Sequence, residues 1–165
     1  MQNKLKALAV AAAMLIACAA GAPTNDNRID PATDKPSADL SGRARTGIAS
    51  FYAKMFFGRK MADGTPMDPE GSNAASRTLP LGTKARVTNL KTGESTVVTI
   101  QDRGPYVKGR IVDLSPATAR QIGITPQMGL AKVEVTPIFV PLPNGSARRG
   151  SAANVAAAAA DRRAE

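Results

Sequence analysis

Apolar and polar residues alternate in short runs along the middle of the chain, and turn-forming residues separate the runs. The runs read GIASFYA, KARVTNL, STVVTIQD, GRIVDLS and AKVEVTPI. An alternation with a period of two places every second side chain on the same face of a strand. The Gly, Pro, Asn and Asp residues between the runs are typical of the turns that join strands. This pattern predicts an all-β fold.

A hairpin is predicted in the centre of this region. The segments 86–90 and 95–101 flank four polar residues, Lys91 to Glu94, and Gly93 among them can adopt the positive φ that tight turns require. The phenyl and phenol rings of Phe51 and Tyr52 are adjacent in another run, so we expect one to face the core and the other to face outward.

One short helix is expected over residues 116–122. Ser115 can cap its first turn, Pro116 suits the first helical position, and Gly123 can supply a left-handed stop. A small closed β-barrel accommodates these elements, because closure leaves no strand edge exposed.

The first residues have the form of an export signal. Lys4 and Lys6 precede an apolar run over residues 7–16, which is shorter than the roughly 20 residues that a membrane span needs. The only cysteine, Cys18, closes the sequence Leu15-Ile16-Ala17-Cys18, which resembles the lipobox of bacterial lipoproteins. That resemblance implies a lipid on Cys18. The alternative is cleavage by the ordinary signal peptidase, with Cys18 a bystander.

Composition divides the chain into four parts. Residues 1–17 are the predicted signal peptide, and residues 18–46, polar and rich in Pro, Asp and Ser, predict a disordered tether. Residues 47–139 hold the β pattern and form the predicted domain. Residues 140–165 are of low complexity, rich in Ala and Arg, and predict a tail.

The net charge of +9 favours an anionic partner such as nucleic acid, acidic lipid or an acidic glycan polymer. Export argues against nucleic acid, because the mature chain would meet the cell wall. The chain has no His and one Cys, so an internal disulfide is excluded and a metal site lacks its usual ligands. We therefore expect no metal and no cofactor. The sequence contains neither a phosphate-binding glycine loop nor a G-x-S-x-G nucleophile motif.

Two carboxylates occupy positions from which a strand could present them. Asp102 ends an apolar strand just before Gly104-Pro105, where it can project into a groove, or else organise the turn together with Arg103. Asp113 lies just ahead of Ser115 and can either anchor the helix entry or line a groove. Tyr106 follows the same corner and can offer a ring for a sugar to pack against.

The segments GIASFYA, FFGRKMADGTPMD, AASRTLPLGTKARVTNLKTG and VTIQDRGPYVKGRIVDLS, with the closing AKVEV, resemble the rare lipoprotein A family in order and spacing. The resemblance implies a six-stranded double-psi β-barrel with one or two short helices. It implies an endolytic peptidoglycan lytic transglycosylase, in which the acid of the DRGP motif is Asp102. The chain departs from the family where Thr65 stands for its Glu and Ser76 for its His.

These inferences together predict a monomeric cell-envelope enzyme, anchored through Cys18 and facing the periplasm, with Ala19 favouring the outer membrane. Its predicted catalytic residue is Asp102. The residues predicted to bind substrate are Tyr52, Thr65, Ser76, Arg103, Tyr106 and Asp113. Because the family's Glu and His are absent, an expansin-like barrel that binds peptidoglycan without cutting it is the alternative.

Overall fold

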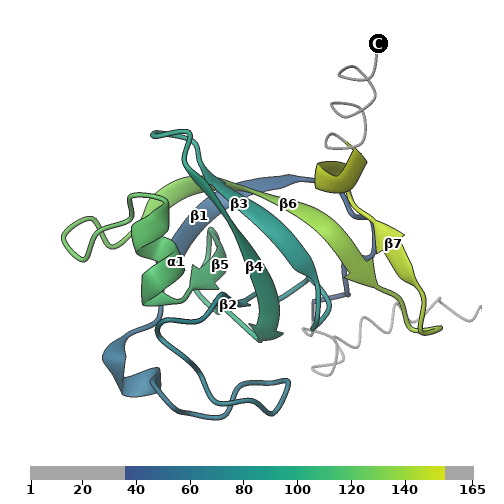
Figure 1. The fold of residues 1–165 in the computed structure, drawn as a ribbon, viewed down its shortest axis with the longest axis horizontal. Helices are drawn as coiled ribbons and strands as arrows, with labels where there is room; N and C mark the ends of the chain where they lie inside the picture. Colours follow the sequence, from purple (N-terminus) through teal and green to yellow (C-terminus); the bar gives the residue numbers. More distant parts are fainter. Residues whose placement is uncertain (1–35, 155–165) are drawn as a thin grey trace, which may run out of the picture. The chain divides into compact units, whose positions relative to one another are not determined.

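The computed structural model describes residues 36–154 (Figure 1). The strands are β1 (Arg45–Phe51), β2 (Asn73–Ala75), β3 (Lys84–Asn89), β4 (Ser95–Asp102), β5 (Arg110–Leu114), β6 (Ala131–Pro141) and β7 (Ala147–Arg149), and the helices are a 3-10 turn, η1 (Lys54–Phe56), and α1 (Pro116–Gln121). The predicted signal peptide, Cys18 and the first half of the predicted tether lie outside the described residues.

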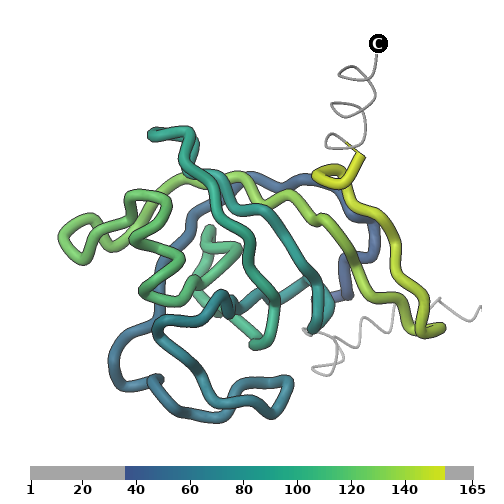
Figure 2. The backbone as a smooth tube through the Cα atoms, viewed as in Figure 1, coloured from purple at the N-terminus to yellow at the C-terminus, as the bar shows by residue number. Residues whose placement is uncertain are grey.

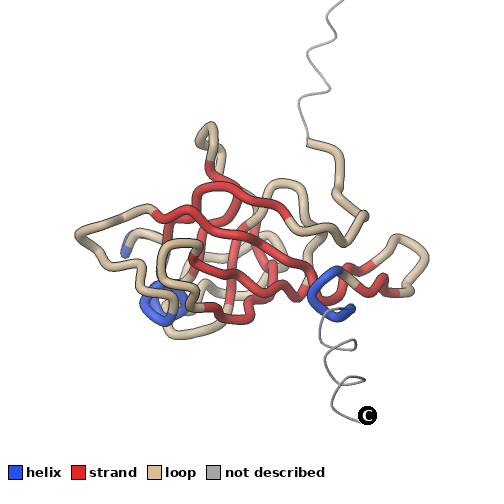
Figure 3. The backbone as a smooth tube through the Cα atoms, turned by 90° about the horizontal axis from the view of Figure 1, so that it is seen from above, coloured by secondary structure: helices blue, strands red, loops and turns tan. Residues whose placement is uncertain are grey.

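Six strands close into a barrel. Their order is β1-β5-β2-β4-β3-β6, and β6 pairs with β1 to complete the ring. The pairs β1–β5 and β2–β4 are parallel, and the remaining pairs in the ring are antiparallel. This mixed six-stranded ring is the double-psi β-barrel that the sequence predicted. Seen from above, the strands form the body of the molecule, and α1 and β7 lie at opposite ends of it (Figure 3).

The barrel interior is filled by the apolar positions of the alternating runs. Val98 and Ile100 of β4, Val112 and Leu114 of β5, and Val133 of β6 are all 0–1% exposed. Side chains of this kind cost about 2–5 kcal/mol of stability when cut to alanine in a closely packed core. The interior is therefore a packed core and leaves binding to the outside of the barrel.

The predicted hairpin and helix are both present. β3 and β4 pair antiparallel across the turn, where Gly93 has a φ of 77°. Helix α1 begins at Pro116 as expected, and the Ser115 hydroxyl accepts a hydrogen bond from the Thr118 N–H at 3.2 Å. Gly123, which follows the helix, has a φ of 72°.

Phe51 and Tyr52 pack in two different apolar clusters, so the prediction that one of them faces outward is wrong. Phe51 packs against the barrel core, whereas Tyr52 belongs to a second apolar cluster with Met61, Met67 and Ala75. Met61 and Met67 belong to the long connection between β1 and β2, which runs outside the barrel as a loop (Figure 2). The loop brings Ala62 and Asp63 next to the end of β4, where their N–H groups donate to Asp102 and Gln101.

Ordered structure extends beyond the predicted domain range of 47–139 on both sides. Within the predicted tether, the Asp39 N–H donates to the Thr78 carbonyl at 2.8 Å, and β1 begins at Arg45. Within the predicted tail, β7 pairs with the end of β6. A Cβ at Gly150 would lie 2.1 Å from the Pro137 carbonyl oxygen, so any residue with a side chain would clash with the backbone of β6 at this position.

Candidate active site

A change of strand register places Asp102 outside the barrel core. Ala74 of β2 pairs with Ile100, but the register between β2 and β4 then shifts, so Ala75 stands opposite Asp102. Simple alternation along β4 would put Asp102 on the same face as Ile100, inside the barrel. A shift of this kind re-aims a side chain at the end of a strand. Asp102 consequently lies on the face of Ala75, beside the second apolar cluster.

Three donors hold the Asp102 carboxylate. Its Oδ2 accepts from the Tyr52 hydroxyl at 3.0 Å, and its Oδ1 accepts from the backbone N–H groups of Ala62 at 3.0 Å and Arg103 at 2.8 Å. Tyr52 directly follows β1, Ala62 belongs to the long loop, and Arg103 begins the corner after β4. A carboxylate has about four lone-pair positions, so three donors orient the group and leave one position open to a ligand.

Tyr52 is buried, and its hydroxyl donates a hydrogen bond to Asp102 from the side of the second apolar cluster. Its ring is 9% exposed and meets the Phe56 ring edge-on, with the centroids 6.1 Å apart. Burial, and then the negative charges of Asp102 and Asp113, raise the pKa of Tyr52 far above its ordinary range. The phenol therefore stays protonated and remains a hydrogen-bond donor to Asp102. The sequence predicted Tyr52 as a substrate-binding residue, and the structure places it behind the carboxylate.

Arg103 does not pair with Asp102 through its side chain. Its Nη1 instead donates to the carbonyls of Ser76 at 3.1 Å and Leu79 at 2.7 Å. The Ser76 N–H donates to the Asp102 carbonyl at 3.1 Å. The Ser76 residue is 3% exposed, and its hydroxyl accepts a hydrogen bond from the Leu79 N–H at 3.3 Å. We call residues 76–79 the wall segment. Arg103 and Ser76 fasten this segment to the end of β4.

Thr65 belongs to an exposed polar group in the long loop. The Asp63 Oδ1 accepts from both the N–H and the hydroxyl of Thr65, at 2.9 and 2.6 Å, and Gln101 Nε2 donates to the other oxygen at 2.8 Å. Slight burial opposes the effect, but these hydrogen bonds hold the pKa of Asp63 below its ordinary value. Neither Asp63 nor Gln101 was predicted as a site residue, because only the folded loop brings them to Thr65.

Asp113 lies on the other side of β2 from Asp102. Ala75 pairs with Asp102 on β4 and with Asp113 on β5, so the backbone positions of the two aspartates are about two strand spacings, roughly 10 Å, apart. Asp113 accepts hydrogen bonds from the Ser50 hydroxyl and from Arg110, and Arg110 also donates to Ser50. The helix entry is capped by Ser115 instead. Ser50 and Arg110 carry no sequence signal that would have marked them.

A hollow of about 530 Å³ opens beside Asp102. Ala62 and Arg103, whose backbone N–H groups donate to Asp102, line it together with Tyr106. Tyr106 is 76% exposed. Pro36 and Ala38 form part of its border. Tyr106 and Arg103, both predicted to bind substrate, thus line one hollow, and Asp102 is connected to it through its hydrogen bonds with Ala62 and Arg103.

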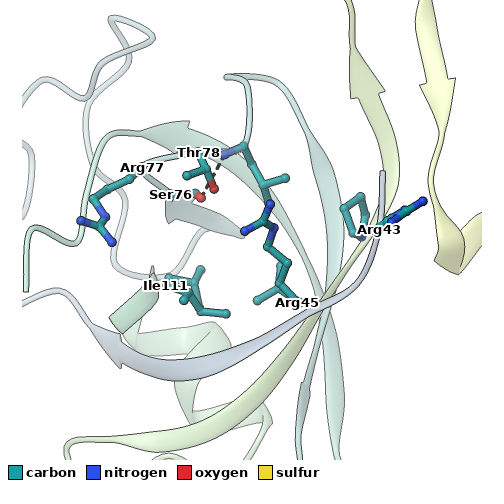
Figure 4. A pocket seen from close by; sticks show the side chains of 10 residues that line it. Arg43, Arg45, Ser76, Arg77, Thr78 and Ile111 are labelled. Carbon is teal, nitrogen blue, oxygen red and sulfur yellow. Dashed lines mark hydrogen bonds between the residues drawn. The ribbon is translucent and has the colours of Figure 1, made fainter. Parts of the chain in front are cut away.

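A second, smaller cavity of about 110 Å³ lies behind the wall segment and shares Arg77 and Thr78 with the larger hollow. Figure 4 shows Arg45 reaching across it toward Ser76 and Thr78, with Ile111 below and Arg77 at the other side. Of its lining, only Ser76 was among the residues predicted from the sequence to bind substrate.

Two features are absent from the described part of the chain, a metal-binding cluster and a membrane-spanning helix. In residues 36–154, His, Cys, Asp and Glu do not form a group of three or more that could hold a metal ion. Over the same residues, no helix has the length and apolar character needed to cross a membrane.

The fold and site define a double-psi β-barrel that carries a fixed carboxylate at a surface groove. A family model described as lytic transglycolase matches residues 31–135, and the chain belongs to this family. It is 53% identical over 88 residues to the endolytic peptidoglycan transglycosylase RlpA of Pasteurella multocida (strain Pm70), a match that covers 53% of this chain and 30% of that protein.

It is also 51% identical over 82 residues to the probable endolytic peptidoglycan transglycosylase RlpA of Synechocystis sp. (strain ATCC 27184 / PCC 6803 / Kazusa), covering 50% of this chain and 26% of that protein. The chain therefore matches less than a third of the length of either relative. Among solved structures, the Streptomyces papain inhibitor superposes with a TM-score of 0.46 at 21% identity, covering 59% of this chain and 97% of that one.

Proposed function

We propose that this protein is an endolytic peptidoglycan transglycosylase of the cell envelope, with Asp102 as its catalytic residue. The observation that carries the proposal is the Asp102 carboxylate, which three donors hold and two of whose partners, Ala62 and Arg103, line a surface hollow. Membership of the lytic transglycolase family, and relatives that bear the name endolytic peptidoglycan transglycosylase, support the same reaction.

One carboxyl group suffices for this chemistry. The protonated Asp102 gives its proton to the glycosidic oxygen as the bond between C1 of N-acetylmuramic acid and the N-acetylglucosamine leaving group breaks. The 6-hydroxyl of the same muramoyl ring then attacks C1 and gives its proton to the Asp102 carboxylate. The product is a 1,6-anhydro ring, water is not consumed, and the acid is regenerated. A hydrolase would usually need a second carboxyl group to activate water.

Thr65 and Ser76 stand where the family has its Glu and His, so in this proposal Asp102 carries out the proton cycle without a second carboxyl or imidazole group at those two positions. Thr65 is exposed and can hydrogen-bond a sugar hydroxyl, whereas Ser76 is buried and supports the wall segment. The alternative function is a barrel that binds peptidoglycan without cutting it. Both functions predict binding to peptidoglycan, and only the first predicts anhydro products.

The deciding experiment is mass spectrometry of the soluble products released from peptidoglycan sacculi by wild type and Asp102→Asn. Asn keeps an oxygen for the two backbone donors and lets the Tyr52 hydroxyl accept from its amide, so the fold is preserved. We expect anhydro-muropeptides from wild type and a loss of at least about 10²-fold in Asp102→Asn, the usual contribution of a general acid. Binding to sacculi should persist in both.

The matched control is Asp68→Asn, which changes an exposed loop carboxylate that accepts a hydrogen bond from the Glu70 N–H. It should release products at the wild-type rate. Anhydro products from Asp102→Asn at the wild-type rate would refute the role of Asp102. Binding by wild type without any anhydro product would favour the non-catalytic barrel.

The location of the enzyme follows from its first residues and not from the described fold. We propose that Cys18 carries a lipid that anchors the chain in the outer membrane, with the barrel in the periplasm, because the lipobox-like sequence ends at Cys18 and Ala19 follows it. Mass spectrometry of the protein isolated from membranes checks this proposal. The N-terminal peptide should begin at Cys18 and carry added acyl mass. A peptide that begins elsewhere without added mass would rule the anchor out.

A further inference from the structure

The smaller cavity behind the wall segment has a chemistry that differs from that of a sugar-binding groove. We call it the arginine cavity; its rim holds Arg45 and Arg77, and its floor is formed by apolar side chains of β5, β6 and the wall segment. Leu79 is 5% exposed, Val112 1% and Val135 4%, so the floor is built from buried core residues. The cavity is thus a rigid feature of the barrel surface.

The two charged side chains of the rim are placed for a ligand. Figure 4 shows the Arg45 guanidinium over the cavity, whereas Arg43 points away from it. The Asp39 carboxylate holds Arg45 by a 2.6 Å contact to Nε and leaves both Nη groups without a hydrogen bond among the described residues. Within residues 36–154, Arg77 makes no ion pair.

Asp39 orients Arg45 in advance of any ligand. The Asp39 Oδ1 accepts from the Ser41 N–H at 3.0 Å, and the Asp39 N–H is bonded to Thr78 of the wall segment. Although burial opposes it, hydrogen bonds from Ser41 and Arg45 keep the pKa of Asp39 below its ordinary value, so the carboxylate stays charged. A guanidinium fixed in this way loses little side-chain entropy when it binds an anion.

The lining favours an anion on a short aliphatic unit over a sugar ring. An aliphatic floor would leave the hydroxyls of a sugar without hydrogen-bond partners, which is costly. Among the described residues that line the cavity, none is acidic. A volume of about 110 Å³ has room for a branched group of a few heavy atoms. Arginine binds carboxylates through two parallel N–H donors.

We propose that the arginine cavity is a subsite for a carboxylate borne on a short aliphatic unit of the peptidoglycan strand, a role that rests on the proposed function. Peptidoglycan offers this chemistry in two places. The stem peptides carry free carboxylates, and removal of the peptides exposes the carboxylate of the lactyl group on N-acetylmuramic acid. Because the cavity and the larger hollow share Arg77 and Thr78, a strand whose sugar lies at Asp102 can direct such a group past the wall segment.

The test compares strands that differ only in their carboxylates. Co-sedimentation of the full-length protein is measured with intact sacculi, with amidase-stripped sacculi, and with each of these after carbodiimide coupling to methylamine, which converts carboxylates to neutral amides. We expect wild type to bind at least one uncoupled form about tenfold more tightly than its coupled counterpart. The form that shows the larger difference identifies the stem-peptide or the lactyl carboxylate as the ligand.

Variants separate the subsite from general charge attraction. Arg45→Gln and Arg77→Gln should each reduce the difference between coupled and uncoupled strands to about twofold. Arg86→Gln makes the same change of charge on an exposed position of β3 and should keep the wild-type difference. Because Arg45 has a structural partner and Arg77 makes no ion pair within the described residues, Arg77→Gln tests the subsite even if Arg45→Gln unfolds.

Each outcome bears on one proposal. Equal binding of coupled and uncoupled strands by wild type, or an equal loss in Arg86→Gln, would overturn the subsite. If anhydro products form without any carboxylate preference, the subsite is wrong and the proposed activity stands. If binding depends on carboxylates and on Arg77 but no product forms, the subsite stands and the proposed activity fails.

Discussion

At the scale of single residues, the contact between Tyr52 and Asp102 decides how the candidate site works. The Tyr52 hydroxyl is the one side-chain donor to Asp102 within residues 36–154, and it lies 50 positions away in the sequence. Tyr52→Phe keeps the ring in its apolar cluster and removes only this donor. A hydrogen bond to a charged group contributes about 1.5–3 kcal/mol, so we expect kcat to fall by roughly 10- to 100-fold.

The expected signature of Tyr52→Phe is a fall in kcat with KM within about twofold of wild type, measured as anhydro product released at several sacculus concentrations. Thr96→Val, which removes a surface hydroxyl that donates to Gln121 at 2.6 Å, is the control and should change neither constant. A rise in KM with kcat unchanged would show instead that the hydroxyl binds substrate directly.

The position of Asp102 could be predicted from the sequence, but its surroundings could not. A carboxylate at the end of an apolar strand before Gly104-Pro105 is a local signal, and the family resemblance points to the same residue. The Tyr52 contact depends on barrel closure, and the outward placement of Asp102 depends on a register shift between β2 and β4. Strand alternation alone gives the opposite face, so no local pattern could have supplied it.

At the scale of elements, local signals predicted what local residues determine. The β3–β4 hairpin and α1 formed as expected, because a turn and a cap lie within the segments themselves. The ordered residues before β1 were not expected, since Asp39 is fixed by Thr78, a partner remote in sequence. The strand β7 is different, because it forms a local hairpin with the end of β6. Asn144-Gly145 in the turn is a hairpin signal that the prediction of a low-complexity tail missed.

The wall segment is tied to the end of β4 by the Arg103 side chain and by backbone and Ser76 contacts. Arg103 bonds two of its carbonyls, Ser76 and Leu79. Arg103→Ala should lower the free energy of unfolding by about 1–2 kcal/mol and speed amide exchange at Ser76 and Leu79. Arg103→Lys should recover only part of the loss, because an ammonium lacks the planar fork of the guanidinium.

Urea unfolding and hydrogen exchange provide the two measurements for Arg103. Arg86→Ala, an exposed arginine on β3, is the control and should stay within about 0.5 kcal/mol of wild type. If Arg103→Ala matches that control in both measurements, the guanidinium does not hold the wall segment, and its place would be at the substrate instead.

At the scale of the whole molecule, the buried phenol couples global stability to alkaline pH. Tyr52 has a raised pKa in the fold because of burial and of the charges of Asp102 and Asp113, whereas in the unfolded chain it returns to its ordinary value of 10.0. Below that value both states are protonated, and the contribution of Tyr52 to stability is fully present. Above it the unfolded chain loses a proton that the fold retains, so stability falls as pH rises.

The slope of this loss can be measured by difference. The free energy of unfolding of wild type should fall with pH by up to about 1.4 kcal/mol per unit more than that of Tyr52→Phe, between roughly pH 10 and 11.5. Subtraction removes the lysines and other groups that titrate in both proteins. Tyr106→Phe removes the exposed phenol and should keep the wild-type slope. If the free energy of unfolding of wild type and of Tyr52→Phe changed with pH in parallel, the Tyr52 hydroxyl would be accessible to solvent in the folded protein. The buried hydrogen bond from Tyr52 to Asp102 would then have to be abandoned.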